Sequence, residues 1–452
     1  MDKHLFRGLG VILLALALSG CWLQLGGGPA NDRFNSAESD LTRDDVDSLA
    51  VEWRTPVDSI MTEPLVSGGR VHVATRKYDD SGSTLDVLAV QTYAAGTGAL
   101  AWETSLLPTN GTDVAGLVET PALAGGALWV PYWHDGMGPC EGRLARLDPA
   151  TGAILSSDVT GTSPSAVVVA GDAVAYMDQS CSGVRVVVRD LATRAVRWTH
   201  TFPAGSSITT PTIADGRLFL LTGDVVYAFD ADGCGTSVCA PLWTEAVTST
   251  FFDFQRLVAG PDDTLVTIGR SSAPEAGSTV VVRDAATGDV RWEAEPRYTG
   301  SLPGAITGIA VAYDTIYVAG STTGPEPFDR EAVLDAYPVG GCGQPVCSPT
   351  STTGFGATRP AREPTVAGGV VYVPLVAGAT SAPAVAAADA HGCGAATCSE
   401  LGRVPLVAGS VFLEAAQPYV TSVGGGRVLV GWLPSLHGST QSQLISLAPT
   451  EG

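Results

Sequence analysis

Charged residues, and basic residues in particular, are scarce in this chain of 452 residues. Only 16% of the residues are charged, and Asp and Glu outnumber Lys and Arg by 46 to 25, which gives a formal net charge of -21 at pH 7. Lysine is nearly absent, so arginine supplies almost all of the positive charge. An acidic surface repels nucleic acid and anionic lipid headgroups. The composition therefore argues against a nucleic-acid-binding function.

Linear motifs of the common catalytic sites are also missing. The sequence has no Gly-x-Ser-x-Gly elbow, no His-Glu-x-x-His pair and no phosphate-binding glycine loop followed by Lys. Its six histidines leave little material for a metal cluster. It does contain 54 Gly and 29 Pro within a chain that is 45% hydrophobic, which is typical of many short strands joined by turns. An all-β fold is predicted.

The N-terminus has the pattern of an export signal. Lys3 and Arg7 precede an apolar run from Leu9 to Leu18, which is too short to span a bilayer comfortably. The next residues, Leu18-Ser19-Gly20-Cys21, resemble the bacterial lipobox, in which cleavage occurs before a cysteine whose thiol carries diacylglycerol. Cys21 is therefore predicted to be the lipid-bearing mature N-terminus. An ordinary secretory signal or an uncleaved anchor is the alternative.

This interpretation divides the chain into three parts. Residues 1–20 are a lipoprotein signal peptide, residues 21–47 are the lipidated cysteine and a flexible tether that contains Gly26-Gly27-Gly28, and residues 48–452 are the folded body. We expect the protein to be lipid-anchored at the cell membrane, on its extracytoplasmic face.

Eight cysteines remain when Cys21 is set aside, in a compartment where disulfides persist. Six of them form three copies of one pattern, with four residues between the cysteines and Gly on both sides of the first, so each pair can close a small loop. The predicted bridges are Cys234–Cys239, Cys342–Cys347 and Cys393–Cys398, with Cys140–Cys181 paired by elimination. Zinc is the alternative, but pairs spread over separate repeats argue against it.

A repeated unit recurs eight times along the chain. Its clearest marker is a tight turn of Gly or Asp followed by an apolar strand, as in Gly68-Gly69-Arg70-Val71 and Gly425-Gly426-Arg427-Val428. Successive markers lie on average 51 residues apart, which suits four short strands per repeat. The chain ends on a third strand, and Leu49 to Arg54 can supply the missing fourth. We predict an eight-bladed β-propeller of four-stranded antiparallel blades, closed by this N-terminal strand; an open solenoid is the alternative.

A second marker makes the repeat more specific. An apolar strand leads to Asp, two further residues, Thr-Gly and then Trp, as in Val281-Val282-Arg283-Asp284-Ala285-Ala286-Thr287-Gly288 and Trp292. This unit resembles the repeat of the pyrroloquinoline-quinone-like (PQQ-like) β-propellers, in a bacterial lipoprotein branch. The resemblance implies that the Asp and Thr-Gly shape a turn and that the Trp packs between adjacent blades.

The same resemblance raises the question of a cofactor. Quinoprotein dehydrogenases of this family hold their quinone beside an adjacent Cys-Cys disulfide and a Ca²⁺ bound by carboxylate and amide groups. No Cys-Cys dipeptide occurs here, so we carry over no catalytic residue and expect no cofactor and no metal. A quinone-dependent or polysaccharide-acting enzyme that uses the propeller mouth is kept as the alternative function.

The first hypothesis is a non-catalytic scaffold at the cell envelope that binds a protein or another ligand. Its predicted binding face carries aromatic residues and carboxylates, which suit recognition of a protein or sugar chain but equally suit strand-end packing. The candidate residues are Tyr78, Asp79, Trp133, His134, Asp135, Phe252 and Asp253. We expect a monomer whose partner is another envelope protein or a cell-wall component, with a membrane contact through the lipid and no nucleic acid.

Overall fold

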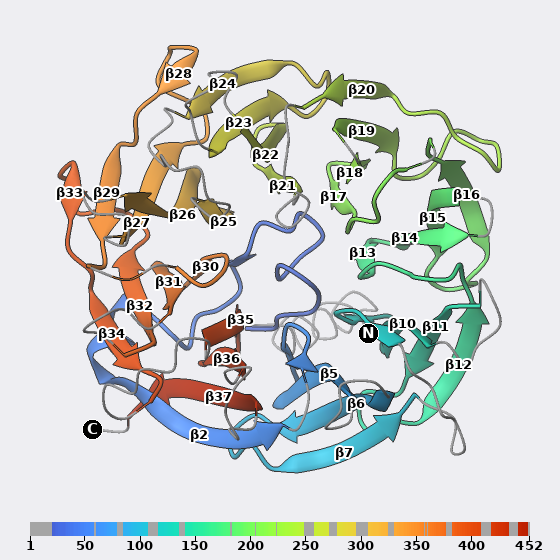
Figure 1. Cartoon of the computed structure of the whole chain (residues 1–452), viewed down its shortest axis with the longest axis horizontal. Helices are drawn as coiled ribbons and strands as arrows, with labels where there is room; N and C mark the ends of the chain where they lie inside the picture. The colour runs from blue at the N-terminus through green and yellow to red at the C-terminus, as the bar shows by residue number, and fades with distance from the viewer. Residues whose placement is uncertain are drawn as a thin grey trace, which may run out of the picture.

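The computed structural model arranges small antiparallel sheets around a central axis (Figure 1). It describes residues 20–57, 60–78, 85–106, 116–134, 141–180, 183–203, 205–222, 224–247, 257–270, 278–294, 306–323, 330–356, 358, 360–376, 382–407, 417–433 and 442–450. Across these residues there are eight sheets, which confirms the predicted eight-bladed propeller.

Each blade contains four strands from the channel to the rim, in sequence order except for the last strand of blade 8, and several blades gain a short extra strand. Blade 1 holds β3 (Ile60–Met61), β4 (Leu65–Ser67), β5 (Arg70–Tyr78), β6 (Leu85–Ala94) and β7 (Leu100–Ser105); blade 2 holds β8 (Gly116–Val118), β9 (Ala122–Ala124), β10 (Ala127–His134), β11 (Arg143–Leu147) and β12 (Ile154–Val159). Blade 3 holds β13 (Val168–Ala170), β14 (Ala173–Ser180), β15 (Gly183–Asp190) and β16 (Val196–Thr201); blade 4 holds β17 (Thr212–Ala214), β18 (Arg217–Thr222), β19 (Val225–Asp230) and β20 (Trp243–Ala246).

The second half of the ring follows the same plan. Blade 5 holds β21 (Leu257–Gly260), β22 (Thr264–Arg270), β23 (Ser278–Asp284) and β24 (Val290–Ala294); blade 6 holds β25 (Ile306–Ala312), β26 (Thr315–Thr323), β27 (Arg330–Pro338) and β29 (Ser351–Gly354). Blade 7 holds β30 (Thr365–Ala367), β31 (Val370–Leu375), β32 (Ala384–Asp389) and β34 (Gly402–Pro405); blade 8 holds β35 (Gln417–Val423), β36 (Val428–Leu433), β37 (Ser442–Pro449) and β2 (Leu49–Val57). The remaining elements are β1 (Phe34–Asn35), the 3₁₀ helix η1 (Arg43–Ser48), β28 (Val346–Cys347) and β33 (Thr397–Cys398).

The turn between the first and second strands of a blade requires left-handed backbone. Gly68 and Gly69 have φ of 57° and 72°, and the equivalent Asp262 and Asp263 have φ of 56° and 50°. Gly adopts this region without steric cost and Asp tolerates it better than most residues. This requirement explains why the first repeat marker contains Gly and Asp.

The last blade closes the ring with a strand from the other end of the chain. Strand β2 pairs antiparallel with β37, with Leu49 opposite Pro449 and Val57 opposite Ser442. The predicted closing strand is therefore confirmed, and the open solenoid is excluded. Closure removes the two exposed sheet edges that an open ring would leave.

Tryptophans on outermost strands connect neighbouring blades. Trp53 of blade 8 donates its indole N–H to Ala95 O of blade 1 at 2.7 Å, and a Cβ on Gly98 of the same turn would lie 2.5 Å from the Trp53 ring. Trp292 of blade 5 repeats the contact with Val339 O and Gly341 of blade 6. The Gly of the turn is needed because the indole ring occupies the space of a side chain. The inter-blade packing implied by the PQQ-like repeat is confirmed.

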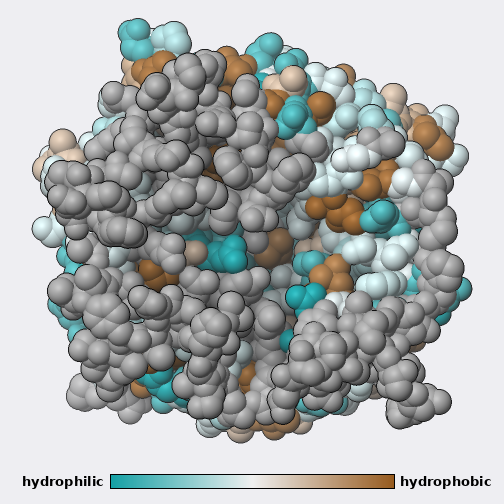
Figure 2. Space-filling model, viewed as in Figure 1, coloured by the Kyte–Doolittle hydropathy of each residue, from teal (hydrophilic) through white to brown (hydrophobic). Residues whose placement is uncertain are grey.

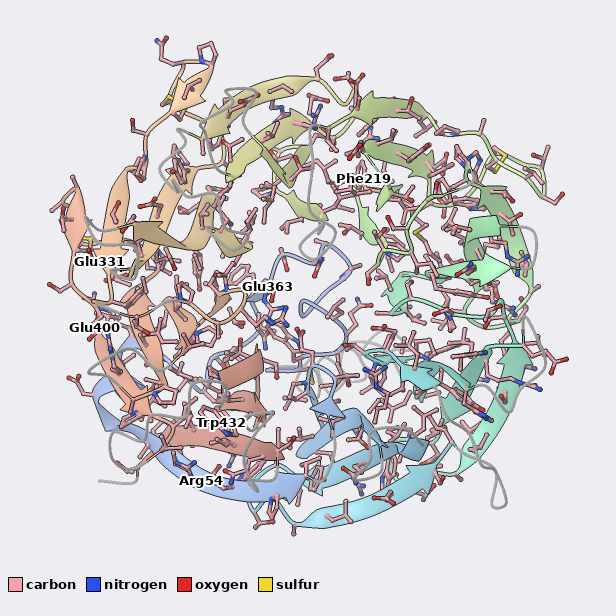
Figure 3. The ribbon with its side chains drawn as sticks, in the orientation of Figure 1. Arg54, Phe219, Glu331, Glu363, Glu400 and Trp432 are labelled. Atoms are coloured by element: carbon pink, nitrogen blue, oxygen red, sulfur yellow. A yellow bond between two sulfur atoms is a disulfide. The ribbon has the colours of Figure 1, made fainter. Side chains whose placement is uncertain are left out.

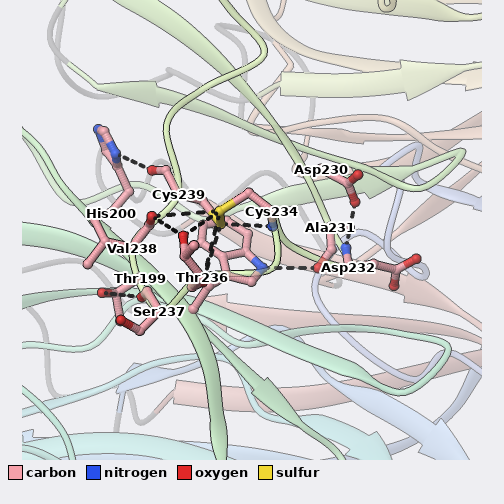
Figure 4. The surroundings of a disulfide bond; sticks show 11 residues. Thr199, His200, Asp230, Ala231, Asp232, Cys234, Thr236, Ser237, Val238 and Cys239 are labelled. Atoms are coloured by element: carbon pink, nitrogen blue, oxygen red, sulfur yellow. Dashed lines mark hydrogen bonds between the residues drawn. A yellow bond between two sulfur atoms is a disulfide. The ribbon is translucent and has the colours of Figure 1, made fainter.

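Three of these turns carry the predicted disulfides, Cys234–Cys239, Cys342–Cys347 and Cys393–Cys398, with Cα–Cα distances of 5.6, 5.7 and 5.7 Å. Each hairpin also extends to the rim of the preceding blade. In blade 4, Cys239 N donates to Thr199 O of blade 3 at 3.0 Å and Thr199 N donates to Ser237 O at 2.9 Å (Figure 4). In the same way β28 pairs in parallel with β24, and β33 with β29. The hairpins therefore add a strand to a neighbour's open edge.

The N-terminal segment differs from its prediction. Residues 21–47 were predicted to form a flexible tether, but Trp22, Leu41 and Val46 are buried, and η1 packs against the last blade. Figure 1 shows the beginning of the described chain, in blue, winding through the centre of the ring before it reaches β2. Among the described residues, no helix is long and apolar enough to cross a membrane.

Candidate functional site

The centre of the propeller is occupied by residues 20–35, which we call the channel segment. It visits the blades in their sequence order and accepts a backbone N–H from each. The N···O distances are 2.7–2.9 Å. The accepting oxygens, each with the residue whose backbone N–H donates to it, are Gly20 O (Gly425), Trp22 O (Val66), Leu23 O (Leu123), Gln24 Oε1 (Val169), Pro29 O (Ile213), Ala30 O (Ala259), Asp32 O (Val311) and Arg33 O (Val366). One circuit of the segment thus binds the innermost strand or first turn of all eight blades.

This circuit satisfies a requirement of the fold. The innermost strand of a blade has one edge that no other strand of that blade can pair, and an unpaired N–H shielded from water is costly. Carbonyl groups of the channel segment take the place of a neighbouring strand, and at blade 7 strand β1 pairs in parallel with β30. The segment is therefore a structural part of the channel wall.

Glycines allow the segment to bend tightly enough. Gly26 and Gly27 have φ of 69° and 87°, and Asn31 and Arg33 also lie in the left-handed region, with φ of 53° and 57°. A Cβ on Gly27 would lie 3.1 Å from the Trp22 ring. The glycine run that suggested flexibility in the sequence instead permits a compact turn packed against the Trp22 ring.

A buried ion pair joins the segment to blades 1, 7 and 8. Arg33 Nη1 lies 2.8 Å from Glu63 Oε2, and the two side chains are only 2% and 3% exposed. Of the other guanidinium nitrogens, Nε donates to Pro364 O, and Nη2 donates to Thr365 Oγ1 and Thr421 O. Glu63 Oε1 also accepts the Trp22 indole N–H and the Gly26 N–H, both at 2.8 Å. Both charges are thus compensated by short hydrogen bonds.

Two neighbouring groups have shifted pKa values. Burial alone would lower the pKa of Arg33, but attraction to Glu63 and Glu363 raises it overall. Burial raises the pKa of Asp32 to about 7, against the lowering effect of the Phe34 N–H that donates to its carboxylate. Asp32, which belongs to the segment that holds the blades together, therefore titrates near neutral pH.

A small pocket lies against the channel segment. It is lined by Asn31, Arg33, Val258, Ile268, Thr307, Gly308, Ile309 and Glu363. Figure 3 places Glu363 near the centre of the ring, and Figure 2 shows the centre of the same face as a hollow with hydrophilic and hydrophobic atoms at its floor. Because each nitrogen of the Arg33 guanidinium already donates to the protein, the pocket offers little free positive charge to a ligand.

The channel does not fit the quinone and calcium site of a quinoprotein dehydrogenase. The sequence lacks the adjacent Cys-Cys pair, and among the described residues no group of three or more His, Cys, Asp and Glu side chains could hold a metal ion. The space beside the innermost strands is filled by the chain's own Trp22 and Arg33. No catalytic step through such a cofactor follows from this arrangement.

The predicted binding face is described only in part. Trp133 and His134 lie at the end of β10; Trp133 is half-buried, and His134 is buried and stacks on Tyr132 with ring centroids 6.5 Å apart. The side chain of Tyr78 and all of Asp79, Asp135, Phe252 and Asp253 lie outside the described residues, as do Cys140 and Cys181. For His134, packing is therefore the role that the contacts support.

Sequence reasoning missed the channel segment. Trp22, next to Cys21, and Arg33, in a chain with few basic residues, were available signals of burial. Most of their hydrogen-bond partners are distant in the sequence: Trp22 bonds to Glu63, and Arg33 contacts Thr365 and Thr421, more than 300 residues away. Only the closed ring brings these groups together.

The fold defines the class of protein: a closed β-propeller of eight four-stranded blades with a self-filled channel. A family model of the PQQ type, described as "Outer membrane protein assembly factor BamB", matches residues 140–324. Together with the repeats, this makes the chain a propeller of the PQQ/BamB type. No curated protein sequence matches it.

Solved structures of two enzymes have folds similar to that of this chain, and an assembly factor superimposes less well. Quinohemoprotein alcohol dehydrogenase from Comamonas testosteroni superimposes with a TM-score of 0.64 at 13% identity, over 97% of this chain and 83% of that one. A europium-containing methanol dehydrogenase gives a TM-score of 0.62 at 13% identity, over 95% and 98% of the two chains. BamB from Moraxella catarrhalis gives 0.42 at 18% identity, over 72% and 96%. At these identities the likeness concerns the fold.

Proposed function

We propose that this protein is a non-catalytic scaffold of the cell envelope, anchored to the membrane by lipid and used to bind another envelope protein or a cell-wall component. The observation that supports this function is the filled channel: the site where an enzyme of this fold would gather its reactants is built from the chain's own residues. A partner is then bound by the outer surfaces of the ring. The family description, which names a protein assembly factor, is consistent with a protein partner.

The anchor is the Cys21 side chain. A glycerophospholipid transfers its diacylglyceryl group to the thiol, so that a thioether forms, the headgroup phosphate leaves and the thiol proton is lost. Water then cleaves the peptide bond between Gly20 and Cys21. The hydrogen bond from Gly425 to Gly20 is lost with the signal, and the bonds to the other seven blades remain.

Replacement of the lipid-bearing cysteine tests the anchor. We expect Cys21→Ser to move the protein from the membrane fraction to the soluble fraction of cells, and to abolish incorporation of labelled palmitate. Cys234→Ser, in an exposed hairpin, is the matched control and should leave the protein on the membrane. Retention of the Cys21→Ser protein on membranes would contradict the proposed anchor.

Crosslinking in intact cells tests the scaffold function. Because Lys77 is the only lysine after the signal, amine-reactive reagents are unsuitable, whereas the many Asp and Glu side chains suit a dihydrazide reagent that joins carboxyl groups. We expect crosslinks to one or a few envelope components, at surface carboxylates. In parallel, purified protein is dialysed against pyrroloquinoline quinone with Ca²⁺; stoichiometric binding or dehydrogenase activity would overturn the scaffold function in favour of the enzyme.

A further inference from the structure

Each blade has two kinds of end. The turns between its first and second strands and between its third and fourth strands lie on one side of the ring, which we call the turn face; the other connections lie on the opposite side, the loop face. We propose that the turn face is held against the membrane, with the loop face directed away from it. This inference rests on the proposed lipid anchor at Cys21.

Cys21 lies on the turn face. Its Sγ is 3.7 Å from Ser67 Oγ, and Ser67 is the last residue of β4 before the Gly68-Gly69 turn. The residues on either side agree: Gly20 O accepts from Gly425 in the corresponding turn of blade 8, and Trp22 pairs with Val66. Later in the chain, Glu38 accepts the Gly426 N–H on the same side. A lipid on Cys21 therefore leaves the protein at this face.

No flexible linker separates Cys21 from the folded body. A flexible tether of 27 residues would let the propeller wander about 30 Å from its lipid and turn freely. Instead, the residue after Cys21 is fully buried, with its N–H bonded to Val66 O at 2.9 Å and its indole bonded to Glu63. Because the chain is fixed within one residue of the lipid, the membrane meets the surface around Cys21 directly.

Several acidic groups of the turn face are paired with arginines, which lessens the repulsion expected between this acidic protein and anionic headgroups. Arg197 pairs with Asp172 at 2.7 Å and with Asp190 at 2.6 Å, both next to turns. Arg217–Asp263, Arg291–Asp284 and Arg427–Glu52 repeat the arrangement in other blades, at 2.8–3.0 Å. Such exposed pairs add little stability. They do neutralise acidic groups that would otherwise repel anionic headgroups.

A partner would then meet the loop face and the rim. This places the predicted binding residues at the end of β10, Trp133 and His134, on the side away from the lipid, since β10 runs from its first turn toward the loop face. The proposed scaffold function thereby gains an orientation: the membrane is on one side of the ring and the partner on the other.

Paired labels on single strands can measure this orientation. On β12, Ile154 and Val159 are both 51% exposed and lie at the turn-face and loop-face ends, about 17 Å apart along the strand. On β16, Val196 and Thr201 form a second exposed pair on a different blade, which separates tilt from inversion. Each is changed to Cys, for example Ile154→Cys and Val159→Cys, and labelled with a fluorophore in the mature lipidated protein.

The labelled proteins are reconstituted into phosphatidylcholine vesicles that contain a lipid with a nitroxide on its headgroup. On both strands we expect the turn-face label to be quenched several-fold more strongly than the loop-face label. Equal quenching would show a flexible tether, and the opposite order would show the opposite orientation; either result overturns the inference. The protein without an added cysteine, taken through the same labelling, gives the background.

Vesicle flotation and the intact mass of the N-terminal peptide are recorded on the same samples. Protein that does not float, or that lacks a lipid on Cys21, overturns the proposed anchor and this inference with it. Protein that floats with the lipid in place but shows the wrong quenching order overturns the inference alone.

Discussion

The inner and outer edges of the blades face the same physical problem, which is a strand with one unpaired side, and the molecule solves it in two ways. At the inner edge, one continuous segment binds all eight blades through residues 20–35. At the rim, separate disulfide hairpins cover the outermost strands of blades 3, 5 and 6. A shared partner makes the inner edges dependent on one another, whereas each hairpin acts on one junction. A substitution that breaks contacts at the centre should therefore lower the free energy of unfolding more than one that breaks contacts at the rim.

The largest effect is expected at the Arg33–Glu63 pair. Arg33→Met leaves the Glu63 carboxylate buried without its cation and should lower the free energy of unfolding by about 3–5 kcal/mol, measured by urea denaturation. The double variant Arg33→Met with Glu63→Gln removes both charges and should recover much of this loss. If Arg33→Met lowers the free energy of unfolding by less than the rim variants described below, the difference between centre and rim is contradicted.

The pH dependence of stability should also originate at the centre. The pKa of Asp32 is raised from 3.8 to about 7 in the folded state, so the folded protein holds a proton that the unfolded chain has released between about pH 4 and 7. The contribution of Asp32 to the free energy of unfolding is fully present below pH 4 and is lost as the pH rises from 4 through 7. Asp32→Asn, which keeps the neutral form, should match wild type at pH 4 and exceed it at pH 7 by up to about 1.4 kcal/mol for each pH unit crossed.

The exposed Asp232 in the blade 4 turn supplies the control for this titration. Asp232→Asn should follow the wild-type curve across the same range, measured as the urea midpoint at each pH. If the Asp32→Asn protein keeps a constant difference from wild type between pH 4 and 7, Asp32 does not titrate there.

A smaller effect is expected when one hairpin is opened. Cys342→Ser with Cys347→Ser frees a loop of six residues and should lower stability by about 2 kcal/mol. It should also raise hydrogen exchange in β24, whose edge β28 covers, and leave β7 unchanged. Protection lost equally around the ring would show that the rim is as cooperative as the centre.

The smallest effect is expected at an exposed ion pair of blade 8. Arg427 donates to both Glu52 oxygens at 2.9 Å, with the two side chains 24% and 28% exposed. Arg427→Gln should cost less than about 1 kcal/mol, and less still at high salt. If Arg427→Gln lowers the free energy of unfolding as much as Arg33→Met does, burial does not determine how much an ion pair contributes to stability.

The parts of this fold that could be predicted are those with local causes. Asp190 accepts hydrogen bonds from the N–H and the hydroxyl of Thr193, three residues later. Because both partners lie in the same short motif, the turn can be predicted from the sequence. The ring size, the closing strand and the three hairpins followed from such markers. The channel segment did not, because its partners lie in eight separate blades and its Gly26-Gly27-Gly28 run has the composition of a linker. The pocket beside Asn31 and Glu363 was missed for the same reason.

The circuit of the channel segment also sets an order of events. The segment is synthesised first, yet its partners extend to Val366, and Asn35 donates its side-chain amide to Val423 O in the last blade. The circuit of residues 20–35 can therefore begin with blades 1 and 2, but it cannot be completed until almost the entire chain has emerged. Until the last blade is made the circuit stays incomplete, and in the finished ring the pairing of Trp22 with Val66 holds Cys21 in place.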